Sequence, residues 1–215
     1  MKQLFLLVAA LLSGSVTMAQ NPYFGQKRSL FEALPITSRD IVFLGNSITD
    51  GGEWAELFDN RHVKNRGISA DRSSWLLDRL DPIVGGHPRK LFLMIGTNDL
   101  AAGATPAEVE ANVRKLVERF RAESPWTRIY IQSILPVNGR SFDHYRDHYA
   151  QAESIRTTNA LLEALCDGKQ VVWIDLYKEL ADSNGDLNAA YTNDGLHLMG
   201  EGYLVWRDAI KPYVK

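Results

Sequence analysis

The chain contains five short apolar runs, which alternate with longer segments whose apolar residues recur at helical spacing. The runs are nearly continuous and rich in β-branched residues, which is typical of parallel strands buried on both faces. Alternating strands and helices indicate the α/β class in a three-layer arrangement. We therefore expect strands at Ile41–Leu44, around His62–Asn65, and at Leu91–Ile95, Ile129–Ile134 and Val171–Ile174.

Helical periodicity is clearest over Pro106–Ala122. Thr105 can cap this helix, while Pro106 and Glu108 suit its first turn. Apolar residues then recur on one face, which favours packing of that face against a core. Further helices are expected at Glu53–Phe58, Ser73–Leu80, Asp147–Leu165 and Gly200–Ile210.

The N-terminus has the organisation of a secretory signal peptide. A short basic start precedes the apolar run Leu4–Leu12, which is too short to span a bilayer. Thr17 and Ala19 then occupy the −3 and −1 positions of a cut after Ala19. The alternative is an N-terminal core helix. We expect residues 1–19 to be a signal peptide, residues 20–215 to form a single domain, and the protein to be periplasmic or secreted.

Composition narrows the class of protein further. An apolar content of 45% and a charged content of 23% exclude global disorder. The net charge of −2 argues against a broad nucleic-acid surface. No later run is long enough to cross a membrane, so no integral membrane association is expected. Cys166 is the only cysteine and lies among leucines, which favours a buried structural thiol.

Small and polar residues follow several predicted strands at the point where each strand ends. Gly45–Gly51 follows the first strand, Gly67 the second and Gly96–Asp99 the third. Asp194–His197 stands near the C-terminus. Ligands gather at the carboxyl ends of strands in open α/β sheets. These segments therefore predict an active site assembled from loops on one edge of the sheet.

Acyl transfer explains these residue types. Ester cleavage needs a nucleophile, a base, a group that orients the base, and donors for the oxyanion. Ser47 can be the nucleophile, His197 its base, and Asp194 the group that orients the imidazole. The N–H groups of Ser47 and Gly67 and the amide of Asn98 can form the oxyanion hole. Such a set needs no cofactor and no metal.

Taken in order, Gly-Asn-Ser-Ile, Gly67, Gly-Thr-Asn-Asp and Asp-Gly-Leu-His resemble the blocks of the SGNH (GDSL-type) hydrolases. The resemblance runs from about Ile41 to about Tyr203. It implies a flavodoxin-like three-layer α/β/α sandwich with a five-stranded parallel sheet. It also implies the same roles for Ser47, Gly67, Asn98, Asp194 and His197. The sequence departs from the family at Asn46, where the name-giving Gly-Asp-Ser-Leu block has an acid.

The blocks are similar to those of secreted bacterial carbohydrate O-acetylesterases and of the platelet-activating-factor acetylhydrolase type. The resemblance implies a serine esterase that removes short acyl groups, above all acetyl, from a small-molecule or glycan ester, and an extracellular carbohydrate is the expected substrate. A lysophospholipase, thioesterase or other lipid esterase is the alternative within the class. A non-catalytic carbohydrate-binding protein on the same fold is the alternative from another class.

Some residues have both a functional and a structural interpretation. Trp54 can line a substrate pocket, although packing is an equal expectation. His144 and His148 are four residues apart, but a metal site needs more ligands, and a solvated helix start is preferred. The remaining tryptophans are expected to be core or packing residues; they are Trp75, Trp126, Trp173 and Trp206.

Overall fold

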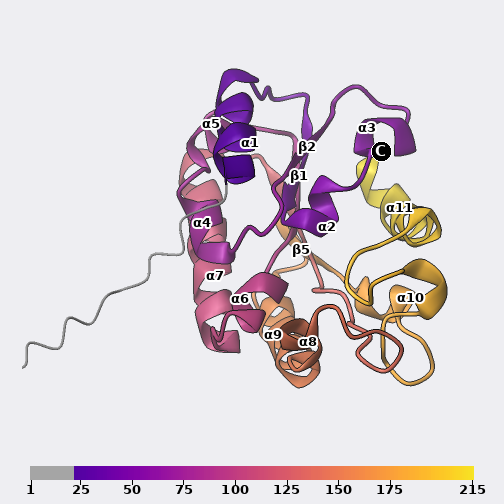
Figure 1. Cartoon of the computed structure of the whole chain (residues 1–215). Helices are drawn as coiled ribbons and strands as arrows, with labels where there is room; N and C mark the ends of the chain where they lie inside the picture. The colour runs from indigo at the N-terminus through magenta and orange to yellow at the C-terminus, as the bar shows by residue number, and fades with distance from the viewer. Residues whose placement is uncertain (1–21) are drawn as a thin grey trace, which may run out of the picture.

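The computed structural model describes residues 22–215, so the expected signal peptide lies outside the described residues. Five strands form one all-parallel sheet in the order β2-β1-β3-β4-β5 (Figure 1). This is the flavodoxin-like strand order, and it confirms the predicted fold class. The strands are β1 (Ile41–Gly45), β2 (Val63–Gly67), β3 (Lys90–Met94), β4 (Arg128–Gln132) and β5 (Val171–Ile174).

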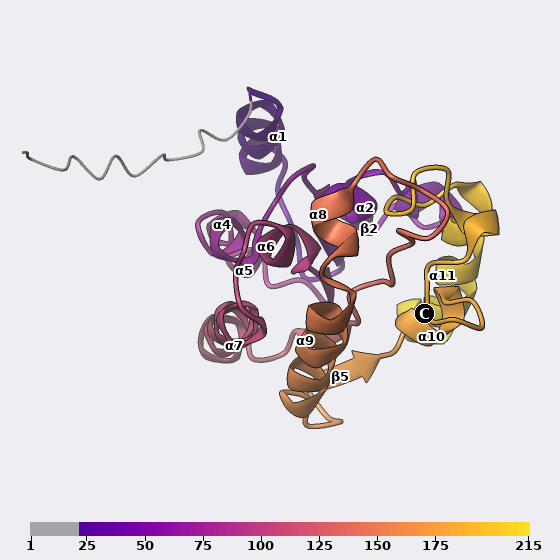
Figure 2. The same ribbon diagram turned by 60° about the horizontal axis from the view of Figure 1, so that its bottom comes forward.

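Helices cover both faces of the sheet, with α4, α5, α7 and α9 on one side and α3 and α11 on the other (Figures 1 and 2). The short helices α2, α6, α8 and α10 lie towards the carboxyl ends of the strands. The helices are α1 (Pro22–Ala33), α2 (Ser47–Asp50), α3 (Trp54–Leu57), α4 (Ser73–Leu77), α5 (Asp81–Val84), α6 (Thr97–Ala101), α7 (Pro106–Glu123), α8 (Arg146–Tyr149), α9 (Ala152–Ala164), α10 (Tyr177–Leu180) and α11 (Gly200–Val214).

Sheet register stacks aromatic rings on the face that α3 and α11 cover. Phe43, Phe92 and Tyr130 are register partners on β1, β3 and β4. Their ring centroids are 4.8 and 4.6 Å apart in successive stacked pairs. Trp54 of α3 stacks on Phe43 at 4.4 Å, and Trp206 of α11 meets Trp54 edge-on. Large buried rings of this kind contribute much of the apolar burial in a core.

The other face of the sheet is aliphatic. Alternate strand residues such as Val42, Leu44 and Leu91 pack under α4, α5, α7 and α9. The α7 helix starts as predicted, because Thr105 and Glu108 form a reciprocal capping box at its first turn. Its apolar face then lies against the sheet and α9.

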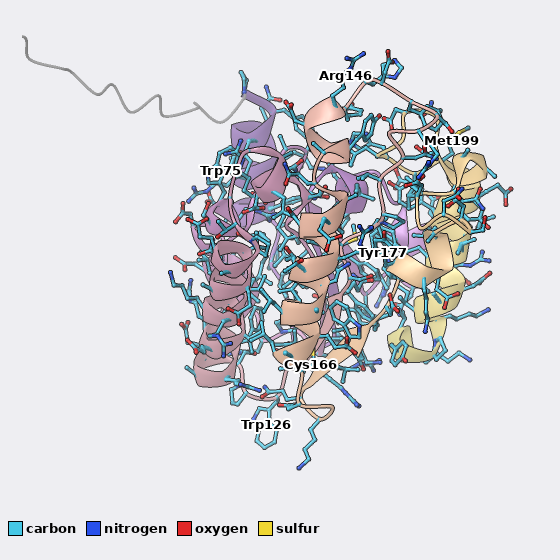
Figure 3. The ribbon with its side chains drawn as sticks, turned by 90° about the horizontal axis from the view of Figure 1, so that it is seen from below. Trp75, Trp126, Arg146, Cys166, Tyr177 and Met199 are labelled. Atoms are coloured by element: carbon cyan, nitrogen blue, oxygen red, sulfur yellow. The ribbon has the colours of Figure 1, made fainter. Side chains whose placement is uncertain are left out.

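Local structure departs from the expectation in several places. The helix predicted over Asp147–Leu165 is interrupted at Ala150–Gln151, which separates α8 from α9. The α1 helix was not expected, because only Phe24 and Phe31 of its twelve residues are buried. The expectation that Trp126 packs in the core is wrong: it is 95% exposed and lies at the opposite end of the molecule from Arg146 (Figure 3).

Candidate active site

Ser47 is the first residue of α2, directly after β1. Asn46, between β1 and α2, caps the N-terminus of this helix, and its side-chain oxygen accepts a hydrogen bond from Ile48 N at 3.1 Å. A short amide side chain is therefore sufficient to cap α2 at the position where the name-giving block has an acid. Gly45 is required at the turn, because a Cβ there would lie 2.4 Å from the Met94 carbonyl oxygen.

Ser47, His197 and Asp194 form one continuous hydrogen-bonded chain. Ser47 Oγ lies 3.0 Å from His197 Nε2, and His197 Nδ1 lies 2.8 Å from Asp194 Oδ2. The other carboxylate oxygen of Asp194 accepts hydrogen bonds from the backbone N–H groups of Leu196 at 2.9 Å and His197 at 2.8 Å. The structure thus brings together the three residues that the sequence marked as nucleophile, base and orienting acid.

The environment of Asp194 favours its ionised form. Partial burial alone would raise the pKa of this carboxyl group. The hydrogen bonds from the N–H groups of His197 and Leu196, together with the His197 ring, lower its pKa below the ordinary value. A carboxylate held ionised in this way can fix the tautomer of His197 that leaves Nε2 free to accept the Ser47 proton.

A loop between β4 and α9 braces the segment that carries Asp194 and His197. Gly195 has φ +81°, and a Cβ there would lie 2.5 Å from the Asn138 carbonyl oxygen. Asn138 N donates to Gly195 O at 2.9 Å, and Tyr149 OH donates to the Asp194 carbonyl oxygen. Tyr145 packs edge-on against the His197 ring at 5.2 Å. No signal in the sequence marked these contacts, because they join segments that are far apart in the chain.

Asn98 lies in the first turn of α6, and its amide is held from both sides. Its Nδ2 donates to the Asp71 carbonyl oxygen at 3.0 Å, and its Oδ1 lies 3.0 Å from His148 Nε2. His148 is half-buried, which corrects the expectation of a solvated helix start. Burial lowers the pKa of His148 below its ordinary value, and nearby His197 lowers it further. The contact orients the Asn98 amide with its NH₂ group away from His148.

Gly67 does not offer the free N–H that the sequence predicted for an oxyanion donor. Its N–H already donates to Asn65 Oδ1 at 2.8 Å, and a Cβ at Gly67 would lie 2.2 Å from Asp50 N. Gly67 therefore allows β2 to pack closely against α2. Asn65 in turn donates to backbone carbonyl oxygens at the end of α2, which keeps it in place.

Ala70 is the residue of this loop that shares a hollow with Asn98 and His148. It adopts φ +65°, an uncommon conformation for a residue other than glycine. Its backbone N–H makes no hydrogen bond with the part of the chain that the structure describes. Ala70 could not be chosen over Gly67 from the sequence, because residue type does not reveal a positive φ at an alanine.

A buried ion pair between Arg79 and Asp71 connects the loops that carry the site residues. Arg79 Nη2 lies 2.6 Å from Asp71 Oδ2, with exposed side-chain fractions of 3% and 0%. The same guanidinium nitrogen donates to the carbonyl oxygens of Gly45 and Arg66, at the ends of β1 and β2. Because the Asp71 carbonyl accepts from Asn98, the pair links three segments of the site.

The suggestion that Trp54 contacts substrate is wrong. Its side chain is 1% exposed and packs between Phe43 and Trp206, and its Nε1 donates to the Thr49 carbonyl oxygen at 2.8 Å. Trp54 is therefore a core residue that supports α2 from below.

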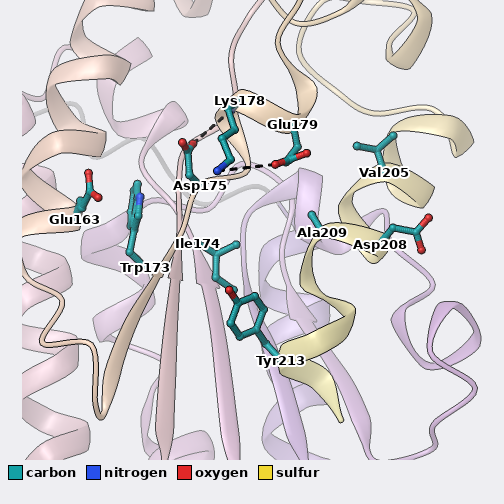
Figure 4. Close-up of a pocket in the computed structure, with 10 residues that line it drawn as sticks. All are labelled: Glu163, Trp173, Ile174, Asp175, Lys178, Glu179, Val205, Asp208, Ala209 and Tyr213. Carbon is teal, nitrogen blue, oxygen red and sulfur yellow. Dashed lines mark hydrogen bonds and ion pairs between the residues drawn. The ribbon is translucent and has the colours of Figure 1, made fainter.

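A separate hollow of about 670 Å³ lies between β5, α10 and α11 (Figure 4). Its lining includes the acidic residues Asp175 and Glu179 and the basic Lys178, but none of the Ser47, Asp194 and His197 set. Across residues 22–215, no group of three or more His, Cys, Asp or Glu side chains is placed to hold a metal ion. Within the same range, no helix combines the length and apolar character that a membrane span requires.

The model of the GDSL-like lipase/acylhydrolase family matches residues 43–205, a stretch that contains every residue of the hydrogen-bonded chain. The chain belongs to this family. As a GDSL-type acylhydrolase it is a carboxylic ester hydrolase, and the seryl–histidine–aspartate geometry agrees with that chemistry.

Among curated relatives of this acylhydrolase, platelet-activating factor acetylhydrolase IB subunit alpha1 from Bos taurus is 27% identical over 190 residues, which cover 83% of this chain and 78% of the relative. N-acylneuraminate cytidylyltransferase from Escherichia coli is 28% identical over 193 residues, or 88% of this chain. The chain spans only 43% of the length of that second protein.

Solved structures support the same family. A protein from Streptococcus pneumonia, described as a platelet activating factor, is 30% identical with a TM-score of 0.82, covering 90% of this chain and 93% of that one. A GDSL-like lipase from Bacteroides thetaiotaomicron is 25% identical with a TM-score of 0.76, covering 89% and 96%. An acetylxylan esterase from Geobacillus stearothermophilus shares the fold at 19% identity and a TM-score of 0.63, covering 83% and 95%.

Proposed function

We propose that this acylhydrolase is a serine acetylesterase that acts on an extracellular carbohydrate ester, and that residues 1–19 direct its export. The observation that carries the proposal is the chain of hydrogen bonds from Ser47 through His197 to Asp194, at the edge of the sheet where Asn98 and Ala70 present donors. This arrangement contains each group that ester cleavage needs.

In the proposed first step, His197 Nε2 accepts the proton of Ser47 Oγ as that oxygen attacks the acyl carbon. The bond to the alcohol oxygen then breaks, and His197 returns the proton to the leaving alcohol. The acetyl group is left on Ser47. In the second step His197 deprotonates a water molecule, whose oxygen attacks the acetyl carbon. The bond between that carbon and Ser47 Oγ then breaks, His197 returns the proton to Ser47 Oγ, and acetate leaves. Asp194 stabilises the protonated imidazole in both steps.

We propose three donors for the oxyanion: the N–H groups of Ser47 and Ala70 and the Nδ2 of Asn98. Ser47 is the first residue of α2, and the N–H groups of the first turn of a helix have no acceptor within the helix. The Ala70 N–H replaces that of Gly67, which Asn65 already engages. Loss of one such donor typically raises the barrier by about 3 kcal/mol.

A short acyl group is favoured by the residues beside Asn98. The hollow there has a volume of about 490 Å³ and is lined by alanines and polar side chains instead of large apolar ones. A long alkyl chain would need an extended apolar groove. The acetyl group in the name of the platelet-activating factor relatives supports the same acyl preference. Because these relatives are named for platelet-activating factor, an acetyl ester of a lipid is the second candidate substrate.

The test is hydrolysis of p-nitrophenyl esters of increasing acyl length, with Ser47→Ala as the matched variant. We expect fast turnover of the acetate, a steep fall by butyrate or octanoate, and loss of nearly all turnover in Ser47→Ala without loss of the fold. Circular dichroism checks that the variant is folded. Substantial turnover by Ser47→Ala would refute the nucleophile assignment, and a preference for octanoate would favour a lipid or thioester substrate.

A further inference from the structure

The end of the sheet opposite Ser47 carries a row of basic side chains. All five parallel strands begin there, and an exposed arginine or lysine stands at, or within two residues before, the start of each strand. Backbone hydrogen bonds join these entry segments, from Arg89 N to Asp40 O and from Arg128 N to Arg89 O. Because neighbouring strands lie about 4.8 Å apart, the cations line up across the end of the sheet. In sheet order, this basic row consists of Arg61, Arg39, Arg89, Arg128 and Lys169.

Acidic side chains do little to neutralise the basic row. None of its five side chains forms an ion pair or donates a hydrogen bond to another residue within 22–215. Three acids lie within two residues of the row in the sequence. Asp40 is buried and accepts hydrogen bonds from Thr37, and Asp167 pairs with Arg121 at 2.8 Å. Of the three acids, Asp59 alone is exposed and has no partner among the described residues.

Lys90 shows how close these charges are to one another. It is the first residue of β3 and the register partner of Arg128, and its Nζ donates to the Tyr213 carbonyl oxygen at 2.6 Å. Burial lowers the pKa of Lys90, and the charges of Arg89 and Arg128 lower it further. Like charges that act together on one ammonium group produce a positive potential over this end of the sheet.

Trp126 projects beside the basic row. It lies two residues before Arg128, and its side chain is 95% exposed, which is unusual for a residue of this size. Gln170 Nε2 donates to the Pro125 carbonyl oxygen at 2.9 Å, so the loop that carries Trp126 is joined to the segment that leads into β5. Figure 3 shows Trp126 at the margin of the molecule, at the end away from Arg146. Nearly the whole indole surface is therefore available to a partner.

We propose that this end of the molecule docks on a bilayer that contains anionic lipids, with the basic row against the head groups and Trp126 inserted at the interface. Positive charge complements an anionic surface. A projecting indole favours a bilayer over a dissolved polyanion, because tryptophan partitions into the membrane–water interface. Ser47 follows β1 at the carboxyl end of the sheet, so the docked enzyme presents its reactive edge to the solution and away from the bilayer.

Sedimentation with vesicles tests the proposal. The protein is used after export, with its mass checked for removal of residues 1–19, and is mixed with vesicles of phosphatidylcholine with or without phosphatidylglycerol. We expect at least tenfold stronger partition onto the anionic vesicles, and loss of this preference at high salt, because salt screens exposed charges. Arg89→Gln with Arg128→Gln should lower the partition coefficient at least tenfold, since each cation near an anionic surface contributes about fivefold. Arg114→Gln with Arg146→Gln removes the same charge from exposed positions outside the row and should change it little.

Tryptophan fluorescence separates insertion from electrostatic contact alone. Vesicles whose acyl chains carry bromine quench a tryptophan that enters the bilayer. Trp54 and Trp206 are buried in the core, so the quenching should come from Trp126 and should largely disappear in Trp126→Ala. Because Trp126 is exposed and far from Ser47, this variant should fold and hydrolyse p-nitrophenyl acetate as the wild type does. The vesicle-bound wild type should also keep its turnover of this soluble ester.

Equal partition onto neutral and anionic vesicles, or an equal effect of the two double variants, would overturn the proposal because the basic row would not be the contact. Quenching that persists in Trp126→Ala would overturn the inserted tryptophan. Tighter binding to dissolved polygalacturonate than to the anionic vesicles would assign the row to an acidic polysaccharide instead. Loss of turnover on the vesicles would mean that the bilayer covers Ser47. Failure of the proposed function is separately visible, because vesicle binding is measured without any ester.

Discussion

Replacing Arg79 by methionine should strongly destabilise this protein. Methionine keeps much of the side-chain length but removes the charge and every N–H donor. The substitution would leave Asp71, which is 0% exposed, without its cation. Burial raises the pKa of Asp71 to about 6 even with Arg79 beside it, so the carboxylate depends on that cation to stay ionised. The carbonyl oxygens of Gly45 and Arg66 would also lose a donor.

Removal of one partner from a buried ion pair costs about 3–5 kcal/mol. In a protein of this size, each kcal/mol lowers the melting temperature by about 2–4 °C. Arg79→Met should therefore lower the free energy of unfolding by about 4 kcal/mol and the melting temperature by roughly 8–16 °C. Catalysis should also weaken, because the Asp71 carbonyl oxygen positions Asn98.

Urea unfolding followed by circular dichroism at pH 7.5 measures the change. Arg114→Met is the control, because its exposed pair with Glu110 should contribute less than about 0.5 kcal/mol. The double variant Arg79→Met with Asp71→Asn removes the orphaned charge and should recover part of the loss. If the free energy of unfolding of Arg79→Met lies within about 1 kcal/mol of the wild-type value, the Arg79–Asp71 ion pair does not stabilise the loops of the site.

Three further predictions concern His148 and Cys166, two groups with shifted pKa values. His148→Phe should lower kcat at least tenfold with little change in KM, because Asn98 loses the group that orients its amide. His148→Gln keeps an N–H donor for Asn98 and should retain most of the wild-type kcat. Equal losses of kcat in both variants would contradict a positioning role for His148. Burial raises the pKa of the Cys166 thiol to about 12, above that of the unfolded chain, so the unfolded state loses its proton first and the free energy of unfolding should fall as pH rises from about 9. This half-buried thiol should react more slowly with iodoacetamide at pH 8 in the native protein than in urea, because its raised pKa leaves little thiolate; equal labelling rates in the two states would contradict that shift.

The strands and the main helix could be predicted because their pattern reflects burial directly. Runs such as Leu91–Ile95 are apolar on both faces, and only a sheet covered on both sides buries them. The weakest expectation was β2, an edge strand whose Lys64, Asn65 and Arg66 interrupt the apolar run. Even there the position was correct to within two residues.

The hydrogen-bonded chain could be predicted from short blocks, but the groups around it could not. Ser47 and His197 each stand in a local pattern, whereas His148 reaches Asn98 across 50 residues of sequence. Whether Gly67 or Ala70 offers a free N–H depends on where the Asn65 side chain points, which residue types do not reveal. Trp54 and Trp126 are the same residue type, yet one is buried and the other exposed, because packing decides exposure.

Tyr203 of α11 donates to the Ile48 carbonyl oxygen at 2.8 Å, and Ser47 contacts His197 across 150 residues of sequence. The nucleophile is thus made before its base and before the helix that holds α2 in place, which follow it by 150 residues or more in the chain. Contacts of such long sequence separation close large loops, and the entropy cost of that closure slows folding. Recovered esterase activity therefore reports that this long-range contact has closed, because Ser47 has no base until the segment that carries His197 lies against α2.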